Sequence, residues 1–203
     1  MEQTETEVKF HVADRDQMHD RLLACGAVPE ETVFEINIRL DDAGRSLRAA
    51  DRLLRLRQDK VATLTFKTPP AQPDDEFKTY TEIETTVGDF EAARKILAAI
   101  GFAEVQRYEK QRRIYRVDDA HFCLDIMPYG VFLEIEGEKA AIRRLAAGLG
   151  LPWERRILAN YLEMFAYIRE TANLPFTDVT FDNFTDVAVD LPALLRRFQV
   201  GNP

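Results

Sequence analysis

Charged and uncharged side chains alternate at the start of the chain. Glu5, Glu7 and Lys9 are separated by single uncharged residues. Because successive side chains of a β-strand point to opposite faces, this spacing predicts a strand with one charged and one apolar face. Further stretches whose pattern predicts a strand cover residues 32–40, 51–58, 63–67, 80–84, 105–117, 122–127 and 132–136.

Apolar residues recur at helical spacing between several of these strands. Helices are predicted over residues 14–25, 90–100, 139–149, 152–170 and 191–200. Gly26, Gly101 and Gly150 follow the first three of them, and Asp89 is placed to cap the second. The prolines between residues 69 and 73 predict an exposed, mobile loop. Since the strands between the helices read mostly as antiparallel, the predicted fold class is α+β.

The apolar faces of the strands indicate how the sheet closes. Helices packed on those faces would leave the charged faces to converge, which predicts a closed or nearly closed antiparallel β-barrel with a polar, charged lumen. A solvated face is the commoner explanation for one such strand, but here the charged positions recur in step along the chain. The side chains expected in the lumen are Glu5, Glu7, Glu82, Glu84, Asp125, Glu134, Glu136, Lys9, Arg55, Arg57, Lys67, Lys110 and Arg112.

Such a lumen favours a ligand over a purely structural role. Enclosing many charges for stability alone is costly, because desolvation can exceed the Coulombic gain even when each charge is paired. Lysines and arginines from several strands suit a polyanion, above all a triphosphate, which arginine binds with two parallel hydrogen bonds. The carboxylates would repel that ligand unless divalent cations intervened, so Mg²⁺ or Mn²⁺ is implied.

Composition bounds the remaining possibilities. The 203 residues suit one domain, and 46% hydrophobic with 31% charged residues indicates a folded protein. A net charge of -8 disfavours nonspecific nucleic-acid binding, which needs cationic surface. The chain has no apolar run that could span a bilayer, and its acidic start is unlike a signal peptide, so we expect a cytoplasmic protein. Cys25 and Cys123 are too few for a disulfide framework and are expected to be buried.

The pattern becomes irregular after the last long helix. We therefore expect one domain over residues 1–170 and a C-terminal extension over 171–203 that is not a separate domain. The extension either caps the barrel or packs against another subunit. A homodimer is thus one open alternative.

The succession of charged motifs resembles the CYTH superfamily, the triphosphate tunnel metalloenzymes. The resemblance spans residues 1 to about 168, and within the superfamily the class IV adenylyl cyclase and thiamine triphosphatase branch is most similar. The finer likeness rests on Gly26-Ala27, on Leu124-Asp125 and on residues 161–163. The motifs that carry the family resemblance are Glu5-x-Glu7-x-Lys9, Arg55-x-Arg57, Lys67 near a proline, Glu82-x-Glu84, Lys110-x-Arg112 and Phe132-x-Glu134-x-Glu136.

The resemblance implies roles for these residues. Glu5, Glu7 and Lys9 are the expected catalytic residues, and Lys9 also contacts the triphosphate. The expected function is class IV adenylyl cyclase-like, converting ATP to cyclic AMP and pyrophosphate. Alternatives are hydrolysis of tripolyphosphate, thiamine triphosphate or a nucleoside triphosphate, and noncatalytic binding of a nucleotide or polyphosphate.

The residues expected to contact metal or phosphate come from several strands. Glu82 and Glu84 either bind metal or orient the arginines. The other expected phosphate contacts are Arg55, Arg57, Lys67, Lys110 and Arg112, and the other expected metal ligands are Glu5, Glu7, Asp125, Glu134 and Glu136.

Overall fold

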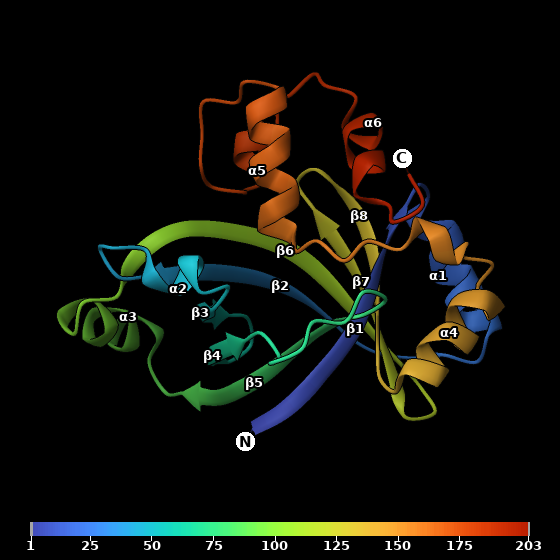
Figure 1. The fold of residues 1–203 in the computed structure, drawn as a ribbon, viewed down its shortest axis with the longest axis horizontal. Coiled ribbons are helices and arrows are strands. Elements are labelled where there is room, and N and C mark those ends of the chain that lie inside the picture. Colours follow the sequence, from blue (N-terminus) through green and yellow to red (C-terminus); the bar gives the residue numbers. More distant parts are fainter. Residues whose placement is uncertain (1, 203) are drawn as a thin grey trace.

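The computed structural model describes residues 2–202, and in it eight antiparallel strands close into a barrel (Figure 1). The strands are β1 (Glu2–Val12), β2 (Val28–Asp41), β3 (Leu53–Gln58), β4 (Ala62–Thr68), β5 (Lys78–Val87), β6 (Ala103–Val117), β7 (Ala120–Met127) and β8 (Gly130–Glu136). Their order around the barrel is β1-β5-β4-β3-β2-β6-β7-β8, and β8 pairs with β1. The predicted fold class and all the predicted strands are confirmed.

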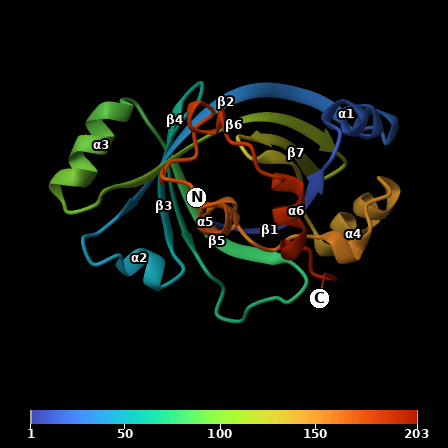
Figure 2. The same cartoon turned by 90° about the horizontal axis from the view of Figure 1, so that it is seen from above.

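The helices lie outside the barrel. They are α1 (Arg15–Ala24), α2 (Ser46–Ala49), α3 (Phe90–Ala99), α4 (Lys139–Gly148), α5 (Tyr161–Thr171) and α6 (Leu191–Leu195), with short 3₁₀ turns at Trp153–Arg155, Asp182–Phe184 and Arg196–Phe198. In both ribbon views α1 and α4 lie beside each other at one side of the barrel and α2 and α3 lie at the opposite side (Figures 1 and 2). The pair α5 and α6 stands over one end of the barrel. Because the helices lie outside, the lumen is left to polar side chains.

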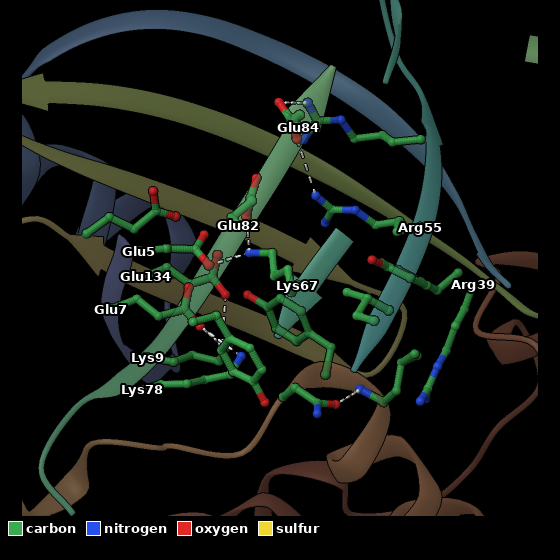
Figure 3. Close-up of a pocket in the computed structure, with 18 of the residues that line it drawn as sticks. Glu5, Glu7, Lys9, Arg39, Arg55, Lys67, Lys78, Glu82, Glu84 and Glu134 are labelled. Carbon is green, nitrogen blue, oxygen red and sulfur yellow. Dashed lines mark hydrogen bonds and ion pairs between the residues drawn. The ribbon is translucent and has the colours of Figure 1, made fainter. Parts of the chain in front are cut away.

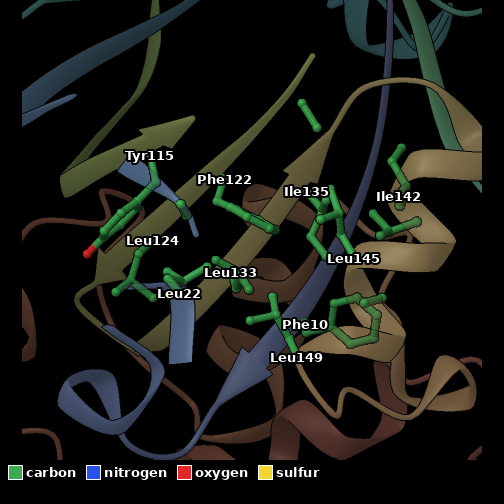
Figure 4. Close-up of a cluster of buried hydrophobic side chains, with 14 of the residues drawn as sticks. Phe10, Leu22, Tyr115, Phe122, Leu124, Leu133, Ile135, Ile142, Leu145 and Leu149 are labelled. Carbon is green, nitrogen blue, oxygen red and sulfur yellow. The ribbon is translucent and has the colours of Figure 1, made fainter. Parts of the chain in front are cut away.

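The largest hydrophobic core lies between the barrel wall and helices α1 and α4 (Figure 4). Strand residues whose side chains point away from the lumen, such as Val8 and Ile135, pack there against Leu22 of α1 and Ile142 of α4. All four are fully buried. Burial of an aliphatic side chain contributes about 1.5–3 kcal/mol, so this packing holds the adjacent charged faces of β1 and β8 toward the lumen.

A second core covers the end of the barrel beneath α5. It includes Phe132, at the start of β8, together with Phe165 and Ile168 from α5. Residues after α5 complete it, since Val179 and Leu195 are buried and the Val179 amide donates to the Arg107 carbonyl of β6 at 2.8 Å. Residues between 172 and 202 therefore pack on the barrel end, while the domain boundary expected at residue 170 stays a prediction.

The helix predicted from residue 152 is wrong at its N-terminal end. The helix begins at Tyr161, because Asn160 and Glu163 form a capping box in which each side chain accepts from the other residue's backbone amide. Upstream, Ile157 instead pairs with β1, where its amide donates to the Lys9 carbonyl at 2.7 Å. This pairing anchors the segment before α5 to β1.

The proline-rich loop between β4 and β5 is only partly as predicted. Its middle, residues 71–73, is exposed. Its far end is held on α4, because Asp74 and Glu76 pair with Lys139 and Arg143, and Phe77 is buried. The pattern of prolines and acids does not show these partners, since they come from a helix more than 60 residues later.

Candidate functional site

The barrel lumen contains a cavity of about 270 Å³ lined mainly by charged side chains. Figure 3 shows acids from β1, β5 and β8 facing Arg55 and Lys67 across it. Every lumen residue predicted from the alternation lines this cavity except Asp125. The period-two pattern and the closure of the barrel together explain the convergence, because each strand contributes one face to the interior.

Three carboxylates form a cluster that could hold a metal ion. Glu5 and Glu7 share one face of β1, and Glu7 lies opposite Glu136 of β8 in the strand register. Oxygen atoms from the three lie within 4.8 Å of one another. Since Mg²⁺ binds oxygen at about 2.1 Å, opposite ligands are about 4.2 Å apart, and small side-chain movements would bring these atoms to that spacing. The all-oxygen, all-carboxylate donor set fits a hard cation such as Mg²⁺ or Mn²⁺.

The acids of this cluster differ in their affinity for protons. Burial raises the pKa of Glu136 to about 7 against the opposing charge of Arg112, and neighbouring carboxylates add to the rise. Burial would also raise the pKa of Glu7, but nearby lysines, above all Lys78 at 3.0 Å from Oε1, bring it to about 2. A divalent cation between them would favour the charged form of both carboxylates and relieve their repulsion.

The opposite wall offers guanidinium groups that are not fully used by the protein. Arg55 donates to the Thr65 hydroxyl at 3.2 Å, and both Arg55 and Arg57 lie 3.9 Å from the Glu84 carboxylate. Yet the Nε atom of Arg55 is buried without a hydrogen-bond partner among residues 2–202, and Arg57 Nε, which also lacks a hydrogen bond there, has an ion pair with Asp59 Oδ2 at 3.2 Å. Because an unmet buried donor costs about 1–3 kcal/mol, these groups suit an anionic ligand that would accept from them.

Lysines of the site pair with acids on other strands. Lys67 pairs with Glu5 and, at 2.6 Å, with Glu82, whereas Lys9 pairs with Glu134 at 2.7 Å. Burial opposes the charge of Lys67, but the carboxylates of Glu5, Glu82 and Glu7 together outweigh it and raise the pKa of Lys67 above its ordinary value. The Lys67 ammonium group therefore stays charged at neutral pH and can face phosphate oxygens.

Asp125 does not line the cavity but lies beneath residues that do. Its side chain is fully buried, and its carboxylate accepts from Lys110 at 3.0 Å, from Arg112 at 2.6 and 2.7 Å and from the Tyr161 hydroxyl at 2.9 Å. Glu35 lies nearby, at 3.5 Å from Lys110 and 3.7 Å from Arg112. Burial would raise the pKa of Glu35, but these two cations bring it to about 2. Asp125 and Glu35 thus bind Lys110 and Arg112 from beneath the cavity lining.

Several cavity residues were missed by the sequence analysis. Lys78 and Tyr80 precede Glu82 on β5 at steps of two, and Tyr108 precedes Lys110 on β6 in the same way, so extending the alternation along each strand would have found them. No period could have placed the residues that come from the start of α5. The further lining residues are Gln3, Arg39, Asp51, Arg52, Leu53, Lys78, Tyr80, Tyr108, Asn160, Tyr161 and Leu162.

The fold and the site together define a closed antiparallel barrel whose lumen combines an acidic cluster with facing lysines and arginines. A sequence model of the CYTH domain matches residues 3–150, and the chain belongs to this family. The resemblance found in the motifs is therefore confirmed.

Known relatives agree with this assignment. The chain is 32% identical over 134 residues to a Methanocaldococcus jannaschii protein named "Putative adenylate cyclase", a match that covers 65% of this chain and 75% of the relative. The PH1012 protein of Pyrococcus horikoshii OT3 has a similar structure, with a TM-score of 0.67 at 26% identity over 78% of this chain and 98% of that one. HpAC1 of Hippeastrum, described as a putative adenylyl cyclase with a dominant triphosphatase activity, has a TM-score of 0.61 at 17% identity, covering 86% and 98%.

Among residues 2–202, no helix combines the length and the apolar character needed to cross a bilayer. The cytoplasmic location and the homodimer considered from the sequence stay predictions.

Proposed function

We propose that this protein is a divalent-metal-dependent enzyme that cleaves a phosphoanhydride bond of a triphosphate held in the barrel lumen. The observation that supports this most directly is the cluster of Glu5, Glu7 and Glu136 in the same cavity as the basic wall. Phosphate binding alone needs only the cations. Carboxylates beside a polyphosphate are useful when a metal ion lies between them and the phosphate oxygens.

Within this proposal the residues divide into two groups. Glu5, Glu7 and Glu136 hold Mg²⁺ or Mn²⁺, which when bound neutralises phosphate charge and lowers the pKa of a bound nucleophile. The phosphate chain is held by Lys9, Arg55, Arg57, Lys67, Lys110 and Arg112.

The remaining acids lie outside the cluster of Glu5, Glu7 and Glu136 and are engaged by phosphate-binding cations, so we assign them a positioning role. Glu82 pairs with Lys67 at 2.6 Å, and Glu84 lies 3.9 Å from Arg55. Glu134 pairs with Lys9 at 2.7 Å and with Arg112, and Asp125 binds Arg112 with both oxygens. Each acid fixes the direction of a phosphate-binding group, which is a use for a carboxylate that does not require contact with metal.

Cyclisation of ATP is the first candidate reaction. The ribose 3′-hydroxyl would form a bond to the α-phosphorus, its proton would pass to solvent or a nearby base, and pyrophosphate would leave. The name of the Methanocaldococcus jannaschii relative, at 32% identity, supports this candidate.

Hydrolysis of a triphosphate is the second candidate, in which water attacks the terminal phosphorus. The cavity volume of about 270 Å³ and its charged lining favour it, because pockets for drug-sized molecules are usually about 300–1,000 Å³ and mostly apolar. A phosphate chain alone suits this space. HpAC1 further illustrates that a chain named as a cyclase can act chiefly as a triphosphatase.

Phosphorus NMR of the products tests the proposal. The protein is incubated with ATP, thiamine triphosphate or tripolyphosphate, each with Mg²⁺ or Mn²⁺, and with EDTA as the metal-free control. Cyclic AMP with pyrophosphate identifies a cyclase, and orthophosphate identifies a hydrolase. Retained binding with no turnover of any of the three substrates would contradict the proposal and favour a noncatalytic binding module.

A further inference from the structure

Tyr161, the first residue of α5, contacts the buried charges at the closed end of the cavity. Its ring centroid lies 4.4 Å from Lys9 Nζ and 5.6 Å from Lys110 Nζ. Its hydroxyl donates to Asp125 Oδ2 at 2.9 Å. The residue lines the cavity, is only 9% exposed, and lies outside residues 3–150 that match the CYTH domain. The barrel strands thus depend on a helix beyond the matched region to complete this end of the site.

The position of Tyr161 is constrained from several directions. The capping box formed by Asn160 and Glu163 fixes the first turn of α5. The Tyr129 hydroxyl donates to the Tyr161 carbonyl at 2.8 Å, and the Phe132 ring meets the Tyr161 ring edge to face, with centroids 5.3 Å apart. Because these contacts hold both the backbone and the ring, the phenol is a fixed surface against which neighbouring lysines can be placed.

The ring offers the lysines something that a carboxylate cannot. An aromatic face attracts an ammonium group through its quadrupole without carrying a negative charge. Lys9 already pairs with Glu134 at 2.7 Å and lies 3.6 Å from Glu7. A further carboxylate in place of Tyr161 would repel an incoming phosphate, whereas the ring holds the ammonium in place and leaves its attraction for an anion intact.

The Tyr161 hydroxyl contacts Asp125, the carboxylate that binds Lys110 and Arg112. Asp125 Oδ2 is shared by Lys110 at 3.0 Å, Arg112 at 2.6 Å and Tyr161 at 2.9 Å. A neutral donor on this oxygen takes up part of its charge without adding a cation. Lys110 and Arg112 are then held less tightly by Asp125 and remain able to bind phosphate oxygens.

We propose that Tyr161 is a positioning residue for the phosphate-binding cations, acting on Lys9 through its ring and on Lys110 and Arg112 through its hydrogen bond to Asp125. The inference rests on the proposed function for the identity of the ligand. It also implies that α5 is required for the polyphosphate site, although the helix lies beyond the matched domain.

The test compares Tyr161→Phe, which keeps the ring, with Tyr161→Leu, which removes it. Tyr167→Phe is the matched control on the same helix, because its ring contacts Arg197 and Phe198 and it does not line the cavity. Calorimetry with tripolyphosphate in EDTA measures phosphate binding without metal or turnover. Steady-state kinetics with Mn²⁺ gives KM and kcat for whichever triphosphate is consumed, and thermal unfolding checks the fold.

We expect tripolyphosphate to bind about threefold to tenfold more weakly to Tyr161→Phe, since the lost hydrogen bond has a charged acceptor. A further loss of about fivefold is expected in Tyr161→Leu, because the cation–π contact is also removed. KM should rise more than kcat falls, and Tyr167→Phe should match the wild type. Wild-type affinity in Tyr161→Phe, or equal affinity in both variants, would overturn the inference.

The two proposals can fail separately. Weakened tripolyphosphate binding in the Tyr161 variants, with no turnover of any triphosphate by the wild type, would support the positioning role and reject the enzyme. Turnover by the wild type with unchanged KM and binding in Tyr161→Phe would reject the positioning role and leave the enzyme standing. Because the phenylalanine variant preserves the packing against Phe132, a folding defect in the leucine variant does not remove the test.

Discussion

Glu136→Gln should make the metal-free protein more stable while impairing metal binding. Burial and the neighbouring acids raise the pKa of Glu136 from its ordinary value of 4.5 to about 7. Because the pKa of Glu136 is higher in the folded than in the unfolded protein, protonation of this side chain favours the folded state. This stabilisation is fully present below pH 4.5 and is lost as the pH rises through about 7. Above that pH the folded protein carries a charge that its surroundings disfavour. Glutamine has nearly the same shape and removes this charge.

The size of the pKa shift of Glu136 determines how much stability Glu136→Gln should gain. A rise of about 2.5 pKa units corresponds to about 3 kcal/mol at pH 8, because each unit is 1.36 kcal/mol. The side chain is partly exposed, so water screens some of this penalty, and we expect a gain of roughly 1–3 kcal/mol. For a protein of this size that gain raises the melting temperature by roughly 2–12 °C. At pH 5 the gain should fall to about a quarter, because most folded molecules then carry the proton.

Thermal and urea unfolding followed by circular dichroism, at pH 5 and pH 8 in EDTA, measure these differences. Glu104→Gln is the matched control, since it makes the same chemical change at an exposed position away from the cavity. Added Mn²⁺ should stabilise the wild type through mass action and stabilise Glu136→Gln far less, because one of three ligands is lost. A variant no more stable than the wild type at pH 8, or one that gains equally at pH 5, would refute the reasoning.

Four other substitutions test separate parts of the site. Glu7→Gln and Arg55→Ala should each abolish metal-dependent turnover in the phosphorus NMR assay with an unchanged circular dichroism spectrum; full activity in both would reject the assignment of the lumen as the active site. Asp125→Asn should lower the unfolding free energy in urea by about 3–5 kcal/mol, because it breaks a buried ion-pair cluster, and a loss under 1 kcal/mol would contradict that role. Asn160→Ala should cost about 1 kcal/mol, seen as a melting temperature roughly 2–4 °C lower; an unchanged melting temperature would show that the capping box does not stabilise α5.

Local periodicity explains why the barrel wall could be read from the chain. In β1, Glu5, Glu7 and Lys9 share one face, and Val8 and Phe10 lie on the other face, buried under the helices. A shift of one residue would place the apolar side chains in the lumen and the charges against α4, so the pattern allows only one orientation of each strand. The same reasoning failed at α5, where apolar spacing continues upstream of residue 161 although Ile157 pairs with β1.

The particular partners of each charge depend on pairings between distant segments. Glu5, Glu7 and Glu136 form the cluster because β8 closes the barrel against β1, about 130 residues away in sequence. Asp125 has the same alternation as the other acids, yet it does not line the cavity, because Lys110, Arg112 and Tyr161 all contact its carboxylate and cover it.

The sequence by itself determined the strand faces, most of the charges that line the lumen and the CYTH family, because each follows from side-chain alternation along single strands and from their order. Only the tertiary structure decided which acids meet, which cations keep unmet donors, and that Tyr161 completes the closed end of the site. The physical reason is that alternation is a property of one strand, whereas strand register, barrel closure and the docking of α5 are set by contacts between segments far apart in the chain.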